Sequence, residues 1–354
     1  MSFPAYDLVG PRRYRERVGL DLEALRAGQV FRHRPGVTVS QQDNLEEALL
    51  TSNQAMLHFD AAYAGATEWA RPLVVSTLTL RLVLGMTDKT FGRRARLVGF
   101  DEIALTAPVF GGDTLYAESE VLAVEPEPGR DDVGALMVAT RGVDQSGRVV
   151  CRATYRALVY RAGRGPDDGP GAGSATAGGD PVGKRPSHRE VAPSVYLEQS
   201  GVDYEDFEPG EVYEHRPGHT FTAERALLRA LRALNQSPPR VELEAARAAP
   251  GGRLAIPEVD VVGAATALST KTFGQVAANL GWTAVSFPHA VHEGDTIHAV
   301  STVLGKREAA SRSGQGILHV RTEARTTAGE LACRFERRLL VYRRGVGPHA
   351  AAGY

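Results

Sequence analysis

Two hydrophobic patterns alternate along this chain of 354 residues and predict its elements. The segment 73–86 is apolar on nearly every side of a helix, which is typical of a helix buried inside a fold. Over residues 115–121 and 149–159, apolar and polar positions alternate instead, which predicts long strands with one solvent-exposed face. A buried helix followed by antiparallel strands is an α+β arrangement, in which the sheet can wrap around the helix.

Shorter elements are predicted before the buried helix. Ser40 is followed three residues later by Asp43, which is typical of a helix N-terminus with a serine cap and an acidic partner. We expect a turn at 53–58 and a second small helix over 61–68. The buried helix is expected to begin near Pro72, because proline suits the first helical position.

The same unit is written twice, at a constant offset of 182 positions. The offset relates residues 30–36 to 212–218, 89–92 to 271–274, 112–114 to 294–296, and 159–161 to 341–343. We therefore predict an N-terminal domain over 1–163 and a C-terminal domain with a short tail over 196–354. A flexible linker rich in Gly, Pro and Ala is expected over 164–195. Two copies are too few for a solenoid, so the halves are predicted to pack as a pseudo-dimer within one chain.

Composition and charge narrow the class of protein. The formal net charge of -1 gives no indication that the protein binds nucleic acid. The longest apolar run contains Arg81 and is too short to span a bilayer, and no signal peptide is apparent. Cys151 and Cys333 are too few for a disulfide framework and are predicted to be buried free thiols. We expect a cytoplasmic protein that binds neither nucleic acid nor membrane.

The turn at 53–58 contains the candidate chemistry. It holds Asn53 and, five residues later, His58, whereas the second copy keeps Asn235 but has Arg240 in place of the histidine. A histidine required only for the fold need not have been lost from one of two similar folds, although simple drift of the second copy would give the same result. His33 and its counterpart His215 occur in both copies and are interpreted as bracing a turn.

These motifs resemble the MaoC-like, (R)-specific enoyl-CoA hydratases and dehydratases. The matching features are a Ser-x-x-Asp helix start, a polar residue ten positions on, histidine five later, Arg-Pro before a buried helix, and Gly-Asp before a long strand. The asparagine at position 53 is similar to that of mesaconyl-CoA hydratases (β-methylmalyl-CoA dehydratases). The resemblance implies two tandem hot-dog domains, one active and one degenerate. Since the histidine is present in the first copy only, the first domain is the expected active half. The resemblance also implies an acyl thioester of coenzyme A, or of a carrier protein, as substrate, and no further cofactor.

Hydration of an enoyl thioester requires a base for water and a donor for the thioester oxygen. His58 is the candidate general base and acid, because the pKa of histidine lies near working pH. Asn53 cannot titrate and is expected to orient the water. The resemblance places the oxyanion donor at the start of the buried helix, where Ser76 stands. Asp60 and Asp43 are possible helpers, although both are expected to cap local turns.

Several alternatives stay open at this point. A thioesterase and a non-catalytic acyl-thioester-binding protein would share the fold. The acyl group is predicted to be short, and branched or dicarboxylic. No metal-ligand spacing is present in the sequence. The linked pair of domains meets the fold's requirement for a partner, and further pairing into a homodimer is open.

Overall fold

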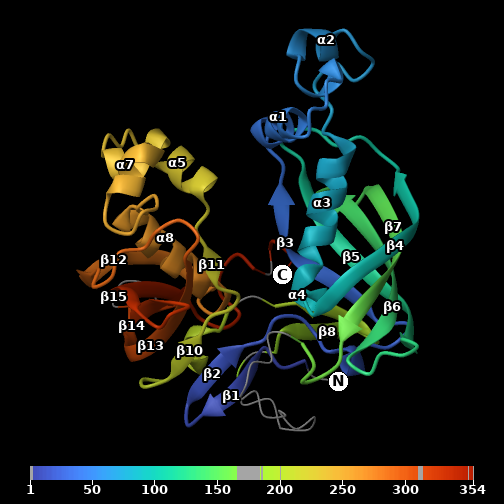
Figure 1. Cartoon of the computed structure of the whole chain (residues 1–354). Helices are drawn as coiled ribbons and strands as arrows, with labels where there is room; N and C mark the ends of the chain where they lie inside the picture. The colour runs from blue at the N-terminus through green and yellow to red at the C-terminus, as the bar shows by residue number, and fades with distance from the viewer. Residues whose placement is uncertain are drawn as a thin grey trace.

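The computed structural model describes residues 3–165, 184, 186–199, 201–309, 314–349 and 351–353. Each half of the chain contributes a central helix that lies against a long antiparallel sheet (Figure 1). The chain thus has the predicted α+β class and forms two tandem hot-dog domains. The first sheet has seven strands, in the spatial order β4 (Arg94–Leu105), β7 (Val149–Tyr160), β6 (Val133–Asp144), β5 (Thr114–Pro126), β3 (Val30–Thr38), β9 (Val195–Glu198) and β8 (His188–Ala192).

The second sheet repeats this order. It has eight strands, and its main path runs β1 (Tyr6–Gly10), β2 (Arg13–Glu16), β10 (Val212–Glu214), β13 (Thr296–Glu308), β14 (Gln315–Thr326), β15 (Leu331–Tyr342) and β12 (Val276–Ser286). The short strand β11 (His219–Thr220) pairs with β13 beside this path. The alternation predicted over 115–121 and 149–159 is confirmed, because these residues lie within β5 and β7 and alternate between the core and more exposed positions.

Helices occupy equivalent places in the two halves. In the first half they are α1 (Gln41–Leu50), α2 (Ala61–Gly65), α3 (Ser76–Met86) and α4 (Asp88–Phe91). In the second half they are α5 (Ala223–Arg232), α6 (Pro238–Val241), α7 (Leu243–Ala248) and α8 (Glu258–Leu268). Short 3-10 turns lie at η1 (Leu22–Ala24), η2 (Met56–His58), η3 (Tyr204–Asp206) and η4 (Ser269–Lys271).

The central helix α3 differs from its prediction in two respects. It begins at Ser76 and not near Pro72, because Leu73 first forms a bridge with Phe110 and so keeps an extended backbone. It is also not buried on every side: Leu78 and Val83 are buried, but Arg81 lies on an exposed face. The apolar run thus spans the end of an extended segment and one buried helix face. The predicted helix start at Ser40 is confirmed by α1, and the second small helix is shorter than expected.

The two sheets exchange their edge hairpins. The hairpin β1–β2 lies near the start of the first half of the chain but pairs with β10 of the second sheet, in parallel register. The hairpin β8–β9 lies at the start of the second half but pairs with β3 of the first sheet. These hairpins are themselves 182 positions apart, so the repeat extends further towards the N-terminus than the similar segments indicated. The sheets therefore do not follow a division of the chain at residues 163 and 196.

The exchange also corrects the predicted linker. Residues 188–192 of the segment 164–195 form strand β8 and are therefore part of the first sheet. Most of the remaining segment lies outside the described residues.

A buried histidine–glutamate pair joins the halves at each exchanged hairpin. The imidazole Nδ1 of His33 lies 2.9 Å from Glu198 Oε1, and that of His215 lies 3.0 Å from Glu16 Oε1. Each glutamate comes from the hairpin of the other half. The other ring nitrogens lie within hydrogen-bond distance of Ser119 and Ser301 hydroxyls. Both histidines thus connect the units, which is a larger role than the predicted bracing of a turn.

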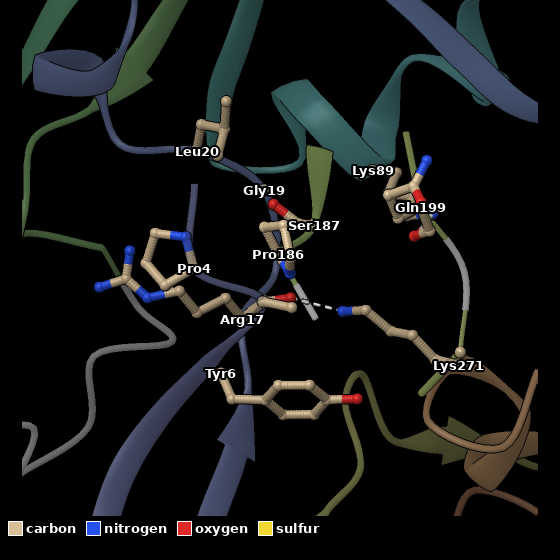
Figure 2. A pocket seen from close by; sticks show the side chains of 12 residues that line it. Pro4, Tyr6, Arg17, Gly19, Leu20, Lys89, Pro186, Ser187, Gln199 and Lys271 are labelled. Atoms are coloured by element: carbon tan, nitrogen blue, oxygen red, sulfur yellow. Dashed lines mark hydrogen bonds between the residues drawn. The ribbon is translucent and has the colours of Figure 1, made fainter. Parts of the chain in front are cut away.

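Two lysines add a further connection between the halves. Figure 2 shows Lys271 of the second half reaching the backbone carbonyl of Arg17, and the Nζ–O distance is 2.5 Å. Lys89 makes the equivalent bond to the Gln199 carbonyl, also at 2.5 Å. Because the histidine–glutamate and lysine–carbonyl contacts between the halves each occur twice, the halves are related by a pseudo-two-fold arrangement, as predicted.

Candidate active site

The loop after helix α1 carries Asn53 and His58. The Asn53 N–H donates to the Ala48 carbonyl at 2.8 Å, which closes the end of the helix. The Asn53 side-chain oxygen accepts the Ala55 N–H at 3.0 Å, an Asx turn that directs the chain into η2. The predicted turn at 53–58 is therefore confirmed, and a short polar side chain forms it.

The hydrogen bond of the His58 ring fixes which nitrogen carries the proton. His58 Nδ1 lies 2.7 Å from the Leu73 carbonyl oxygen. A carbonyl only accepts hydrogen bonds, so Nδ1 carries the proton and the lone pair of the neutral ring is at Nε2. His58 is partly exposed, and no hydrogen bond to its Nε2 occurs within the described part of the chain. The ring is thus held in the form that a general base requires.

Ser76 lies at the start of the central helix. It is exposed and is the first residue of α3, a helix of 11 residues whose N-terminus favours negative charge. The Ser76 N–H has no hydrogen-bond acceptor among the residues that the structure describes, whereas the preceding Val75 N–H donates to Asn44 Oδ1 at 2.8 Å. Ser76 therefore offers an available donor at the positive end of a helix dipole.

Both candidate helper carboxylates cap helices. Asp43 accepts hydrogen bonds from the Ser40 N–H and hydroxyl, which lower the pKa of its carboxyl. Asp60 Oδ1 accepts the Ala62 and Tyr63 N–H groups, each at 3.0 Å, at the start of α2. These bonds match the capping interpretation of both residues.

The predicted residues His58 and Asn53 differ in their hydrogen-bond partners. His58 contacts the backbone just before α3 through Leu73, whereas Asn53 bonds its own turn. Asn44, a fully buried residue of α1, was not among the predicted site residues. Asn44 Nδ2 donates to the His58 and Leu73 carbonyl oxygens at 2.9 and 3.0 Å. Comparison of the two copies contained the signal, since Asn44 corresponds to Ala226.

The second unit has an ion pair at the equivalent positions. Arg240 and Glu258 correspond to His58 and Ser76, and Arg240 Nη2 lies 2.7 Å from each Glu258 carboxylate oxygen. The Asn235 turn is retained, with its side-chain oxygen 2.9 Å from the Ser237 nitrogen. In the second unit these two positions are therefore joined by an ion pair, and neither holds a histidine that could act as a base.

The remaining features of the described residues do not belong to the candidate active site. A cavity of about 790 Å³ is lined by residues that include Lys89, Arg94, Arg216 and Lys271, and by none of the predicted site residues. Within the described ranges, no cluster of three or more His, Cys, Asp or Glu side chains could hold a metal ion. None of the described helices is both long and apolar enough to cross a bilayer.

Sequence comparison relates both halves to known enzymes. A MaoC-like domain model matches residues 23–138, and a mesaconyl-CoA hydratase model matches residues 186–353. The chain is 28% identical to the mesaconyl-CoA hydratase of Cereibacter sphaeroides over 327 residues, which cover 86% of this chain and 89% of that protein. It is 30% identical to the (R)-specific enoyl-CoA hydratase of Aeromonas caviae, over 28% of this chain and 71% of that protein.

A third relative matches over a shorter stretch. The β-methylmalyl-CoA dehydratase of Chloroflexus aurantiacus is 30% identical over 113 residues, and the match spans about a third of that protein's length (32%). Among solved structures, the chain is similar to a double hotdog protein of Mycobacterium tuberculosis, at 20% identity and a TM-score of 0.36 over 92% of this chain and 99% of that one. The sequence matches carry the assignment: the chain belongs to the MaoC-like hydratase and dehydratase family.

Proposed function

We propose that the protein catalyses the reversible addition of water to an α,β-unsaturated acyl thioester of coenzyme A. The observation that carries the proposal is the His58 ring, which is held with its Nε2 lone pair unpaired among the described residues, close to the start of α3. The same positions in the second unit form an ion pair, so the first unit is the active half.

In the hydration direction, His58 Nε2 accepts a proton from water while the oxygen adds to the β-carbon. The Asn53 side-chain amide orients that water. Electrons of the double bond move towards the thioester carbonyl, and the Ser76 N–H and the N-terminus of α3 stabilise the enolate oxygen. The His58 imidazolium then returns its proton to the α-carbon. We assign both proton transfers to His58, because Asp43 and Asp60 are engaged in caps.

The names of two relatives support a proposal for the substrate class. The relative that covers most of the chain is named for mesaconyl-CoA, an unsaturated, methyl-branched dicarboxylic thioester, and another for β-methylmalyl-CoA, its hydrated form. We therefore propose a short, branched, dicarboxylic acyl group, carried by coenzyme A and not by a carrier protein.

The first experiment mixes purified protein with mesaconyl-CoA and, separately, crotonyl-CoA, and follows the conjugated enoyl-thioester absorbance. We expect mesaconyl-CoA to be hydrated faster. His58→Ala should reduce kcat by about 100-fold or more, the usual contribution of a general acid–base. Arg240→Ala, at the same position of the second unit, is the matched control and should keep wild-type activity.

A thiol reagent added to the same reactions distinguishes hydration from thioester cleavage. Release of free coenzyme A would identify a thioesterase. No change in absorbance and no thiol release, with bound acyl-CoA detected by calorimetry, would identify a binding protein. Equal rates for wild type and His58→Ala would contradict the assigned base.

A further inference from the structure

Asn44 occupies the junction between the loop that carries His58 and the start of helix α3. Its side chain is fully buried, and both the amide nitrogen and the amide oxygen are hydrogen-bonded. The amide nitrogen donates to the carbonyl oxygens of His58 and Leu73, and the amide oxygen accepts the Val75 N–H at 2.8 Å. One side chain thus holds three backbone groups from two segments that are 15 to 17 residues apart in the sequence.

The bonded groups are those that determine the geometry of the site. Leu73 O is also the acceptor for His58 Nδ1, so Asn44 fixes the position of the carbonyl that orients the imidazole. Gln41 Nε2 adds a second donor to the His58 carbonyl at 3.0 Å. Asn44 therefore constrains the His58 backbone directly, and the His58 ring through the Leu73 carbonyl.

Asn44 also determines which backbone donor remains available at the helix start. Its oxygen takes the Val75 N–H, and the next N–H along the chain is that of Ser76. A single amide thereby sets the relative positions of the proposed base and the proposed oxyanion donor. These two groups must act on opposite ends of the same conjugated thioester, so an error in their separation is costly to catalysis.

The second unit shows that the fold itself does not need this arrangement. Ala226 replaces Asn44, and Pro257, which has no N–H, replaces Val75. One backbone hydrogen bond of the loop is retained: the Ala255 N–H donates to the Pro239 carbonyl at 3.2 Å, as the Leu73 N–H does to the Leu57 carbonyl. The donor and the acceptor were lost together, in the copy that also lost the histidine.

We infer that Asn44 is a positioning residue, which couples His58 to the Ser76 N–H and is required for turnover but not for folding. The inference rests on the proposed hydratase function for its kinetic test. It predicts that kcat falls while the melting temperature is kept, when the side chain is removed in a way that the fold tolerates.

The second unit supplies the suitable variant. Asn44→Ala alone leaves the Val75 N–H buried without an acceptor, which destabilises the protein. Asn44→Ala combined with Val75→Pro reproduces the pair that the second unit already contains. Val75 has φ -58° and ψ 130°, close to the -54° and 133° of Pro257, so the proline fits without strain.

The experiment measures kcat, KM and melting temperature for wild type and both variants. We expect kcat to fall by about 100-fold in both, the cost of a misplacement of roughly 1 Å, with little change in KM. The melting temperature should fall in the single variant and recover in the double variant. Recovery of kcat together with the melting temperature would overturn the inference, because Asn44 would then act only through stability.

A second readout does not depend on the identity of the reaction. The ¹⁵N shifts of the His58 ring report its tautomer, and wild type should show the proton on Nδ1. In the double variant we expect the mixture of tautomers of an unrestrained histidine. If the wild-type protein hydrates neither thioester, the proposed function fails, and the tautomer measurement still decides on Asn44. An unchanged tautomer in a folded double variant would overturn its positioning role.

Discussion

Arg240 and Glu258 form an ion pair, in which Arg240 Nη2 contacts both carboxylate oxygens, at the positions that His58 and Ser76 occupy in the first unit. The side chains are 25% and 49% exposed, so the pair lies at the surface and not in the core. The duplicated chain thus has different chemistry at these two positions: a candidate proton acceptor in the first unit, and an ion pair between a loop and a helix in the second.

The exposed ion pair of Arg240 and Glu258 should contribute little to stability. For Glu258→Ala, we expect the free energy of unfolding to change by no more than about 1 kcal/mol, as for other exposed ion pairs. Hydration of the enoyl thioester should be unaffected. The measurements are urea denaturation and the absorbance assay, and a large loss of activity would show that the second unit contributes to turnover.

The cross-unit pair of His33 and Glu198 should contribute far more. Burial tends to raise the pKa of the Glu198 carboxyl, but the charge and hydrogen bond of His33 outweigh it, and the pKa is lowered. Glu198→Ala leaves buried polar groups without their partner and should reduce the free energy of unfolding by about 3–5 kcal/mol. Denaturant titration measures the change.

Two matched variants serve as controls for that experiment. Glu16→Ala removes the equivalent carboxylate from the other hairpin and should cost a similar amount, since His215 depends on it in the same way. Glu125→Gln alters an exposed position of β5 and should have little effect. Equal stabilities for Glu198→Ala and Glu125→Gln would contradict the role of the buried pair.

His188 should make stability fall as the pH falls below neutrality. Burial lowers the pKa of its imidazole from 6.5 to about 4. A depressed pKa means that the unfolded chain takes up the proton first, so the contribution is present above pH 6.5 and is lost as the pH falls towards 4. The full loss is on the order of 3 kcal/mol.

The substitution His188→Tyr tests this assignment, because the other hairpin has Tyr6 at the same position. The Tyr6 hydroxyl lies 3.1 Å from Thr272 Oγ1, and His188 Nε2 lies 2.9 Å from Thr90 Oγ1, so a tyrosine should keep the contact. The variant should lose less stability than wild type between pH 6.5 and 5. An equal loss of unfolding free energy in both proteins between pH 6.5 and 5 would refute the assignment.

Neither cysteine should react in the folded protein. Burial raises the pKa of the Cys333 thiol to about 11 and also raises that of Cys151, and both side chains are fully buried. Because the thiolate is the reactive form, iodoacetamide at pH 8 should modify neither residue until denaturant is added. Mass spectrometry of native and unfolded samples measures this, and rapid native labelling would contradict it.

Local patterns in the sequence predicted the local structure well. The Ser40 cap, the turn at 53–58 and the strands β5 and β7 all depend on residues close together in the chain. The start of α3 was wrong because the bridge from Leu73 to Phe110 is a tertiary contact that helix preference does not contain.

The hairpin exchange could not be predicted, for a related reason. Strand β2 could pair with either copy of a repeated edge, and the two edges, β3 and β10, have similar sequences. Asn44 was missed because a polar residue in the first turn of a helix is usually exposed to solvent, and its sequence position gives no sign of burial. Only its replacement by Ala226, together with Pro257 for Val75, marked it out.

The exchanged hairpins have a consequence for how such a chain can change with time. In a single-copy protein with this arrangement, Glu16 of one chain would meet the histidine of a second chain, and both halves of the dimer would carry the same site. Joining the copies makes the exchange internal, so assembly no longer depends on protein concentration. Fusion also allows the two halves to differ in sequence, since a substitution at Arg240 leaves His58 unchanged. One half can thus lose its chemistry and still supply the strand that completes the other.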